Sequence, residues 1–384
     1  MEQGMAEYTS ILIGGDTVPT QYDIRYFMKG DAHHLFKGFL SEFQTADLSL
    51  LNLECPLISY EQMKPIDKIG PSLGAEQEAI NALKGVVDVI GLANNHIMDY
   101  GKKGIFNTID ICKKSGFKVV GAGTNLRKAQ EVAIQECNGI RIAVMAVAER
   151  EFSIASEDSP GANPLDIINY VRYVGLNSHR WDYLIVLLHG GNEYYPYPSP
   201  RLQKVCRFLV EQGANAVIGQ HTHCAGCYEQ YKNATIVYGQ GNLIFHKKNF
   251  DLEWNRGFLV RLDIDANLNC QMKLMPYYQS NNTAGIHEMN SREEKEFIEQ
   301  IEQRSQRIKD ENFVQSSWDR FSKDKKDSYL ALLFLPQVAG IRWLNRKLHI
   351  VDKLLPYSRR KLLLNLIRCD SHLDVLKNIL KKKS

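Results

Sequence analysis

Five short apolar runs, each followed by polar residues of metal-binding type, constrain this chain more than any other feature. Such runs, bounded by Gly or polar residues, are typical of buried strands. Ligands bind outside the carboxyl ends of strands in open α/β sheets, so we expect the residues after these runs to meet at one edge. The runs cover residues 11–15, 48–53, 89–93, 184–188 and 216–219, and they lead to Asp16, Glu54, Asn95 with His96, His189, and His221 with His223. This set predicts a metal-dependent hydrolytic centre.

Helical stretches alternate with these runs as far as about residue 220. We expect helices over residues 74–83, 101–115, 164–176 and 200–212, the last with Ser199 as its N-cap. Beyond this point, predicted strands over residues 235–238, 258–264 and 271–278 follow one another without a long helix, which favours a largely antiparallel second sheet. The pattern predicts an α/β protein with two sheets and helices outside them, a four-layer α/β/β/α sandwich.

The C-terminal part of the chain differs from the rest in charge. Residues 341–384 carry 12 Lys/Arg against 3 Asp/Glu, a net charge of +9, whereas residues 1–340 carry 35 against 41, a net charge of −6. Apolar residues recur at helical spacing over residues 358–381. We expect a first domain over residues 9–280 and a helical, basic extension over residues 281–384. Two interpretations of residues 341–384 stay open: a helical layer packed on the core, or peripheral contact with a membrane or a partner.

Composition and length are those of a globular protein, with 384 residues, 44% apolar and 24% charged. The first ten residues lack a basic segment followed by an apolar one, and no apolar run approaches the roughly 18–20 residues of a membrane span. We therefore predict a cytoplasmic location, peripheral to the membrane if the basic extension binds there. The eight scattered cysteines indicate reduced thiols. The negative charge of residues 1–340 argues against nucleic acid as a partner.

A series of motifs in fixed order resembles one protein family. The motifs are Gly15-Asp16, Asn52-Leu53-Glu54, Asn94-Asn95-His96 with Asp99 and Gly101, the stretches 120–123, 189–194 and 198–200, Gly219-Gln220-His221-Thr222-His223, and Tyr238-Gly239-Gln240-Gly241-Asn242. Over residues 9–265 the chain resembles the bacterial capsule-synthesis proteins associated with poly-γ-glutamate, the CapA-type family. This family has the calcineurin-like metallophosphoesterase fold. The residues after about 280 do not match the family's common core.

The resemblance implies a role for each residue of the set. Glu54 would bridge two ions, with Asn95, His189 and His221 on one and Asp16 and His223 on the other. Two such ions hold a water molecule between them and lower its pKa towards neutrality. His96 would donate a proton to the leaving group while Asp99 fixes its tautomer. Substrate contacts are expected from Glu193, Tyr194 and Asn242, although a role in loop packing stays open for all three.

The chain departs from the wider phosphoesterase pattern at two positions. That pattern begins with Asp-x-His, whereas this chain has Asp16-Thr17-Val18, so one nitrogen ligand is missing. Glu54 stands where many relatives have Asp. We therefore expect one or two divalent ions. Imidazole and carboxylate ligands admit Mn, Fe, Zn or Ni.

We predict a metal-dependent hydrolase, phosphoesterase-like or γ-amide-cleaving, that acts on an anionic small-molecule or polymer substrate. The resemblance places it in the biosynthesis of a capsule or a similar surface polymer such as poly-γ-glutamate. The alternative is a non-catalytic, metal-binding assembly factor of a polymer synthesis or export complex. The presence of His96 and Asp99 favours catalysis, because a purely structural metal site needs no proton donor.

Overall fold

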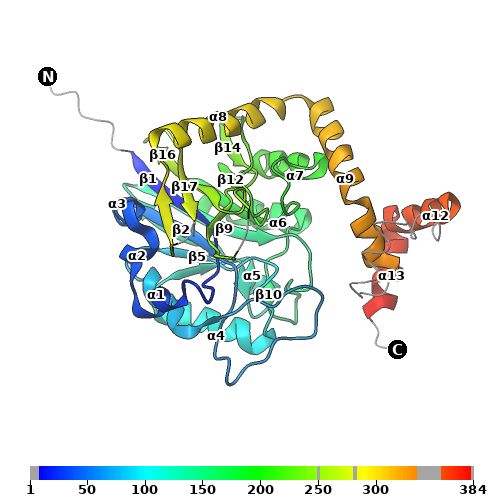
Figure 1. The fold of residues 1–384 in the computed structure, drawn as a ribbon, viewed down its shortest axis with the longest axis horizontal. Coiled ribbons are helices and arrows are strands. Elements are labelled where there is room, and N and C mark those ends of the chain that lie inside the picture. Colours follow the sequence, from blue (N-terminus) through cyan, green and yellow to red (C-terminus); the bar gives the residue numbers. More distant parts are fainter. Residues whose placement is uncertain (1–7, 249–250, 280–282, 335–355, 382–384) are drawn as a thin grey trace. The chain divides into compact units, whose positions relative to one another are not determined.

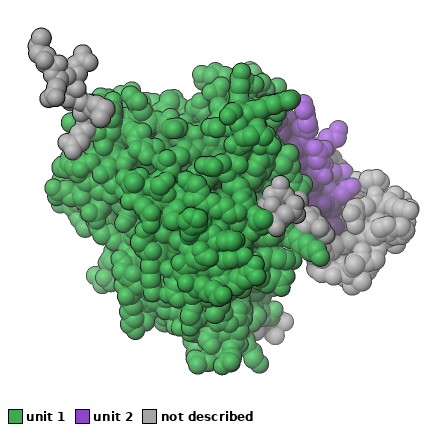
Figure 2. All heavy atoms as spheres, turned by 60° about the vertical axis from the view of Figure 1, so that its left-hand side comes forward, with its two compact units in different colours: residues 1–315 green, residues 316–384 purple. Residues whose placement is uncertain are grey.

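The computed structural model describes residues 8–248, 251–279, 283–334 and 356–381 (Figure 1). The chain divides into two compact units, residues 1–315 and residues 316–384 (Figure 2). Helix α9 (Glu311–Phe334) crosses this division, and the second unit also contains α12 (Tyr357–Arg368) and α13 (Asp370–Lys381). The helices predicted within residues 358–381 are thus confirmed, while residues 341–355 of the predicted basic segment lie outside the described residues. The boundary predicted at residue 280 stays a prediction.

The first sheet contains eight strands in the first unit. Seven follow the order β18-β17-β16-β1-β2-β5-β6, and β15 pairs with β1 beyond the end of β16. The strands are β1 (Thr9–Thr17), β2 (Leu48–Leu53), β5 (Val89–Gly91), β6 (Lys118–Val120), β15 (Asn242–Ile244), β16 (Arg256–Ile264), β17 (Cys270–Gln279) and β18 (Ile286–Glu288). Strands β1, β2, β5 and β6 are parallel, so their carboxyl ends lie at one edge.

The second sheet contains six strands in the order β13-β14-β12-β11-β9-β8. They are β8 (Ala133–Cys137), β9 (Ile140–Ala148), β11 (Tyr183–His189), β12 (Ala216–Gln220), β13 (Tyr228–Tyr231) and β14 (Ala234–Val237). The central four strands are parallel. Two small ladders lie outside the main sheets, β3 (Leu57–Ile58) with β4 (Ala75–Glu76) and β7 (Ala122–Gly123) with β10 (Gly161–Ala162).

The late strands were predicted to form a largely antiparallel second sheet of their own, and this prediction is wrong. Strand β14 joins the second sheet in parallel with β12, whereas β16 and β17 add antiparallel strands to β1 in the first sheet. A connection without a helix indicates an antiparallel neighbour but not which sheet receives it. Strand β2 pairs with one edge of β1, and β16 pairs with residues 9–13 on the other edge.

Apolar side chains on both faces of the second sheet produce the layers. In β11, Ile185 and Leu187 belong to the core between the sheets, whereas Leu184, Val186 and Leu188 pack against the helices outside. This alternation is expected for a strand buried on both faces. Helices α6 (Ile167–Asn177) and α7 (Pro200–Glu211) cover the second sheet (Figure 1). The predicted α/β/β/α order is confirmed.

Short helices and α4 cover the outer face of the first sheet. They are α1 (Ile24–Lys29), α2 (Ala32–Phe36), the 3-10 helix η1 (Lys37–Phe39), α3 (Leu40–Thr45), the 3-10 helix η2 (Gln77–Leu83) and α4 (Gly101–Lys114). Three further elements are α5 (Leu126–Ala129), η3 (Ser178–Arg180) and α8 (Ser291–Arg307). The α-helix predicted over residues 74–83 is wrong, because these residues form strand β4 followed by the 3-10 helix η2. The apolar side chains within residues 79–83 are buried by this short, tightly wound helix, so a longer α-helix is not needed to bury them.

Several details of the helices agree with the sequence. Ser199 caps α7 by accepting a hydrogen bond from the N–H of Leu202 at 3.1 Å, with Pro200 in the first position of the helix. The eight cysteines, all within the described residues, form no disulfide. Within the described part of the chain, no helix combines the length and the apolar character needed to cross a membrane.

Candidate metal centre

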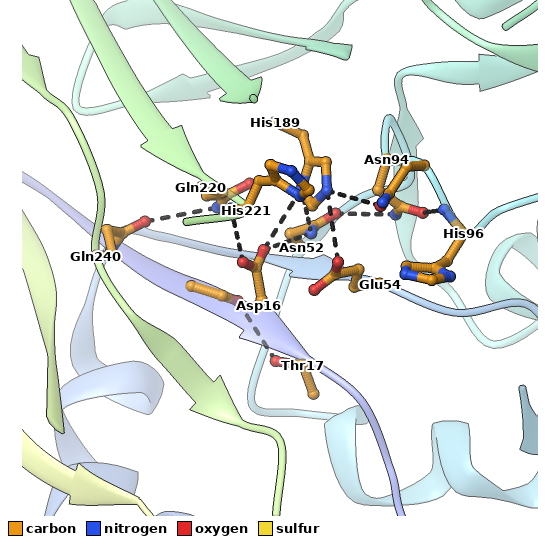
Figure 3. Close-up of polar contacts among 12 residues, drawn as sticks. Asp16, Thr17, Asn52, Glu54, Asn94, His96, His189, Gln220, His221 and Gln240 are labelled. Carbon is orange, nitrogen blue, oxygen red and sulfur yellow. Dashed lines mark hydrogen bonds and ion pairs between the residues drawn. The ribbon is translucent and has the colours of Figure 1, made fainter. Parts of the chain in front are cut away.

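The carboxyl ends of strands from both sheets meet at one place (Figure 3). Asp16 lies near the end of β1 and Glu54 follows β2, while Asn95 lies in the loop after β5. From the second sheet, His189 ends β11, and His221 and His223 follow β12. The predicted set therefore converges, but on an edge that two sheets share, whereas a single sheet edge was expected. The sequence does not show how the two sheets pack against each other, so the shared edge was not predicted from it.

Glu54 lies at the centre of the cluster. Its side chain is fully buried, and neither carboxylate oxygen has a hydrogen-bond partner among the residues that the structure describes. Burial raises the pKa of Glu54 well above its usual value, and the negative charges of Asp16 and Glu193 add to the effect. An unpaired buried carboxylate is costly unless a cation compensates it. The position therefore fits a bound cation.

Two groups of donor atoms share Glu54. Glu54, His189 and His221 form one group, and Asp16, Glu54 and His223 form the other. In each group the nitrogen and oxygen atoms lie within 4.8 Å of one another. A carboxylate common to two donor groups is the arrangement of a bridging ligand.

Asn95 adds an oxygen to the first group. Its Oδ1 lies 3.0 Å from Nε2 of His189, and the same nitrogen lies 3.5 Å from Oε1 of Glu54. Nδ1 of the buried His221 has no hydrogen-bond partner within the described residues. Burial lowers the pKa of His221 well below its usual value, which keeps the ring neutral and able to bind a metal.

Asp16 of the second group is held by two hydrogen bonds. It accepts one from the side-chain amide of Asn52 at 2.7 Å and one from the backbone N–H of His221 at 2.8 Å. Burial alone would raise the pKa of Asp16, but His189, whose Nδ1 lies 3.6 Å from Oδ1 of Asp16, outweighs it together with His223 and Asn52 and lowers the pKa to about 2. Asp16 is thus an ionised oxygen donor at neutral pH.

The turn that carries His221 and His223 has an uncommon backbone conformation. Both residues have left-handed φ angles, 86° and 54°, which non-glycine residues adopt rarely. Such conformations cost on the order of 1–3 kcal/mol and occur often at functional sites. The turn aims both rings at the same centre. Nδ1 of His223 lies 2.8 Å from Oδ1 of Asn242, so its Nε2 is the nitrogen available to an ion.

Glycines allow the strands that carry these residues to approach closely. A Cβ atom on Gly15 would lie 2.4 Å from the carbonyl oxygen of Gly241, and Gly241 itself has a φ of +77°. Neither position can accept a side chain without moving backbone. The contact aligns Asp16 with Asn242 in the β1–β15 register, which brings the partner of His223 to the site.

Asn52 was not predicted as a site residue, although it belongs to a quoted motif. Its amide donates to Asp16 and lies 3.3 Å from Nδ1 of His189, and its carbonyl oxygen accepts from Asn94 at 3.1 Å. It therefore holds one side of the His189 ring, so that Nε2 faces Glu54. Asn52 could have been found from the sequence, because it is a polar residue in a largely apolar buried strand and a buried amide needs hydrogen-bond partners.

His96 lies beside the cluster with its own set of partners. Its Nδ1 is 2.7 Å from Oδ2 of Asp99, and both side chains are buried. Asp99 also accepts from the N–H of Leu73 at 2.7 Å and forms an ion pair with Lys68 at 2.8 Å. The predicted His96–Asp99 pair is thus present, and Lys68 is a residue that sequence reasoning missed.

The three predicted substrate-contact residues differ in their surroundings. Asn242 is fully buried and faces His223, so it positions that ring. Tyr194 is 42% exposed, with its ring centroid 6.4 Å from that of His223. Glu193, which directly precedes Tyr194 in the loop, is exposed, and its negative charge acts on Glu54. Lys247, which no motif indicated, also acts on Glu54 through its charge.

The cluster offers the chemistry of a divalent metal site. Its donors are carboxylate and amide oxygens with imidazole nitrogens, and two of the residues, Glu54 and His221, have donor atoms without a hydrogen-bond partner within the described part of the chain. Borderline first-row metals accept such donors. The first group has four donors with Asn95, whereas the second has three, because Val18 stands where the wider Asp-x-His pattern has a histidine.

Comparisons with known proteins give the following similarities. A sequence profile of the family described as "Bacterial capsule synthesis protein PGA_cap" matches residues 10–247. The "Capsule biosynthesis protein CapA" of Bacillus anthracis is 30% identical over 232 residues, 58% of this chain and 55% of that protein. The "PGA biosynthesis protein CapA" of Bacillus subtilis (strain 168) is 27% identical over 308 residues, 78% of each chain. A "Probable polyglutamine synthesis accessory protein" of Mycobacterium tuberculosis is 27% identical over 220 residues, 53% of this chain and 57% of that protein.

The chain thus spans about half the length of the B. anthracis relative. Among solved structures, a 5'-nucleotidase precursor from Thermus thermophilus is 14% identical, with a TM-score of 0.44, over 77% of this chain and 59% of that one.

Proposed function

The chain belongs to the bacterial capsule synthesis protein family PGA_cap, and from this membership and the geometry of the centre we propose that it is a metal-dependent hydrolase of metallophosphoesterase type. Its substrate is an anionic small molecule or polymer in the synthesis of a capsule or a similar surface polymer. The observation that carries the proposal is Glu54, a buried carboxylate that has no hydrogen-bond partner in the described residues and is shared by two donor groups.

One or two divalent ions would be held there, the first by Glu54, Asn95, His189 and His221 and the second by Asp16, Glu54 and His223. Such ions supply Lewis-acid polarisation of the substrate and activation of water as a nucleophile. The protein itself fixes the donors before any ion arrives. Asn52 and Asp16 hold the Nδ1 side of His189, and Asn242 holds the Nδ1 side of His223. Such support commonly changes metal affinity by about 10- to 100-fold.

The His96–Asp99 pair supplies proton transfer in this proposal. With Nδ1 of His96 directed at Asp99, Nε2 is the nitrogen that can give a proton to a leaving group. The carboxylate of Asp99 fixes the orientation of the His96 ring, and the ion pair with Lys68 fixes the orientation of the carboxylate. Both chemistries left open by the sequence, phosphoester hydrolysis and γ-amide cleavage, need such a donor because an alkoxide or an amide anion leaves poorly.

A second function is favoured by the names of two relatives, which are called probable polyglutamine synthesis accessory proteins. By analogy, this chain would be a non-catalytic assembly factor of a polymer-synthesis complex, with the metal stabilising the fold. The basic extension would then serve as a contact to the complex or to an anionic membrane surface. The His96–Asp99 pair has no role in this alternative.

The test uses the full-length protein and a variant that keeps the shape of the bridge. Metal content is measured by inductively coupled plasma mass spectrometry, and hydrolysis is measured on p-nitrophenyl phosphate, its bis ester and poly-γ-glutamate. Glu54→Gln should lose bound metal and hydrolysis together, whereas Glu151→Gln, an exposed glutamate, should retain both. A wild-type protein that binds metal but hydrolyses none of the three would favour the assembly factor.

A further inference from the structure

Three aromatic residues form a wall on the His223 side of the centre. This aromatic wall consists of Tyr194, Phe245 and Trp254. The ring centroids of Trp254 and Phe245 lie 4.8 Å and 5.6 Å from that of His223. Trp254 is fully buried and Phe245 is 3% exposed, whereas Tyr194 reaches solvent. The wall therefore continues from a metal-binding histidine to the molecular surface.

Lys247 lies on this wall. Its Nζ is 3.9 Å from the ring centroid of Trp254 and 4.3 Å from that of Phe245. The rings hold the ammonium group by cation–π attraction and shield its aliphatic stem from water. Lys247 lies five residues after Asn242, the partner of His223, so strand β15 supports the histidine and the segment directly after it carries the cation.

The charge of Lys247 interacts with acidic residues of the centre. It acts on the carboxylates of Glu54 and Glu193, which both favour its charged form. Burial opposes them and lowers the pKa of Lys247. A partly desolvated ammonium group beside a metal centre is a strong hydrogen-bond donor to an anionic oxygen.

We propose that Lys247, supported by the aromatic wall, is an oxyanion subsite that binds a carboxylate or phosphate group of the substrate next to the group held at the centre. That the bound group is part of a substrate rests on the proposed hydrolase function. Binding of a free oxyanion at Lys247 does not depend on that function. The subsite would give a substrate with two anionic groups an advantage over one with a single anionic group. It would also fix which end of the substrate faces His96, because His96 belongs to the loop of Asn95, whereas Lys247 belongs to the segment after β15, the strand that supports His223.

The chain offers a matched control in the adjacent residue, Lys248, which is exposed. Lys247→Met and Lys248→Met remove the same charge from neighbouring positions, and Lys247→Arg restores a cation. Binding of inorganic phosphate and of glutarate to each full-length protein is measured by isothermal titration calorimetry, together with metal content and thermal stability. The two probes distinguish a phosphate-binding from a carboxylate-binding subsite.

We expect Lys247→Met to weaken binding of at least one probe by about 10- to 100-fold, the size of one charge-assisted hydrogen bond. Lys248→Met should bind both probes as the wild type does, Lys247→Arg should recover most of the loss, and metal content should stay unchanged in all variants. Equal affinity in Lys247→Met and wild type overturns the subsite, even if the protein hydrolyses the test substrates. A loss that Lys248→Met shares also overturns it, because the effect is then one of net charge. Conversely, Lys247-dependent binding in a protein without hydrolytic activity supports the subsite while the proposed function fails.

Discussion

Asp23 provides a test of the structure that does not depend on the metal. This residue precedes α1 and is fully buried, and within the described residues its carboxylate makes no hydrogen bond of normal geometry. Burial raises its pKa from 3.8 to about 7, although the backbone N–H of Gly285 acts in the opposite direction. Nδ1 of His246 lies 3.8 Å from Oδ1 of Asp23, but burial lowers the pKa of His246, so this ring is neutral near pH 7 and offers no compensating charge.

The direction of the pH effect follows from the raised pKa. Between about pH 4 and pH 7 the folded protein holds a proton on Asp23 that the unfolded chain has released, so stability falls as pH rises. The contribution is fully present below about pH 4 and is lost above about pH 7. A difference of about three pH units corresponds to about 4 kcal/mol, of which about 3 kcal/mol is lost between about pH 5 and pH 8.

Asp23→Asn should remove this dependence, because the amide does not ionise. We expect its free energy of unfolding, measured relative to that of the wild type, to increase by about 3 kcal/mol between about pH 5 and pH 8. Urea unfolding at each pH measures the difference, and effects of other groups cancel between the two proteins. Asp158→Asn, an exposed aspartate, serves as the control. Parallel stability curves for Asp23→Asn and wild type would show that Asp23 carries no proton in the folded protein.

Further predictions concern the site and the extension. Asn52→Leu should weaken metal binding by about 10- to 100-fold, because His189 loses the group that orients it. Metal titration measures this change, and an unchanged affinity would assign Asn52 to packing alone. His96→Ala should lower turnover by roughly 10²- to 10⁴-fold with unchanged metal content, and the loss should shrink for p-nitrophenolate, which leaves without a proton. In α13, Ile379 is 60% exposed, and Ile379→Asp should reduce flotation of the protein with anionic vesicles. Asn378→Asp adds the same charge one residue away and should reduce flotation less. Equal losses in the two variants would exclude insertion of Ile379 into the membrane.

The site residues were accessible to sequence reasoning because strand ends fix their position. Asp16, Glu54 and His189 each follow a buried apolar run, and the carboxyl ends of parallel strands share an edge. The assignment of strands was therefore enough to place Asp16 and Glu54 at one edge, whereas their convergence with His189 also depends on how the two sheets pack. The roles of bridge, ligand and proton donor came from the family resemblance and stay predictions.

Contacts made by long side chains from loops were not accessible in this way. Lys68 and Lys247 lie in segments without a periodic pattern, and only tertiary packing brings one to Asp99 and the other to Trp254. The same limit applied to β16 and β17, whose hairpin was evident but whose pairing with β1 was not. Sequence periodicity reports the faces of an element, whereas the choice between two open sheet edges depends on long-range competition.

The donor atoms come from both sheets, and this couples ion binding to the assembly of the whole core. Asp16 and Glu54 are contributed by the first sheet and His189, His221 and His223 by the second, so neither half of the sequence can chelate an ion with the full set. A ligand that binds only the assembled state stabilises it by about 2.7 kcal/mol at a concentration about 100 times its dissociation constant. Chelators should therefore lower the melting temperature by an amount that depends on free metal concentration, because a bound ion would act as a cross-link between the two sheets.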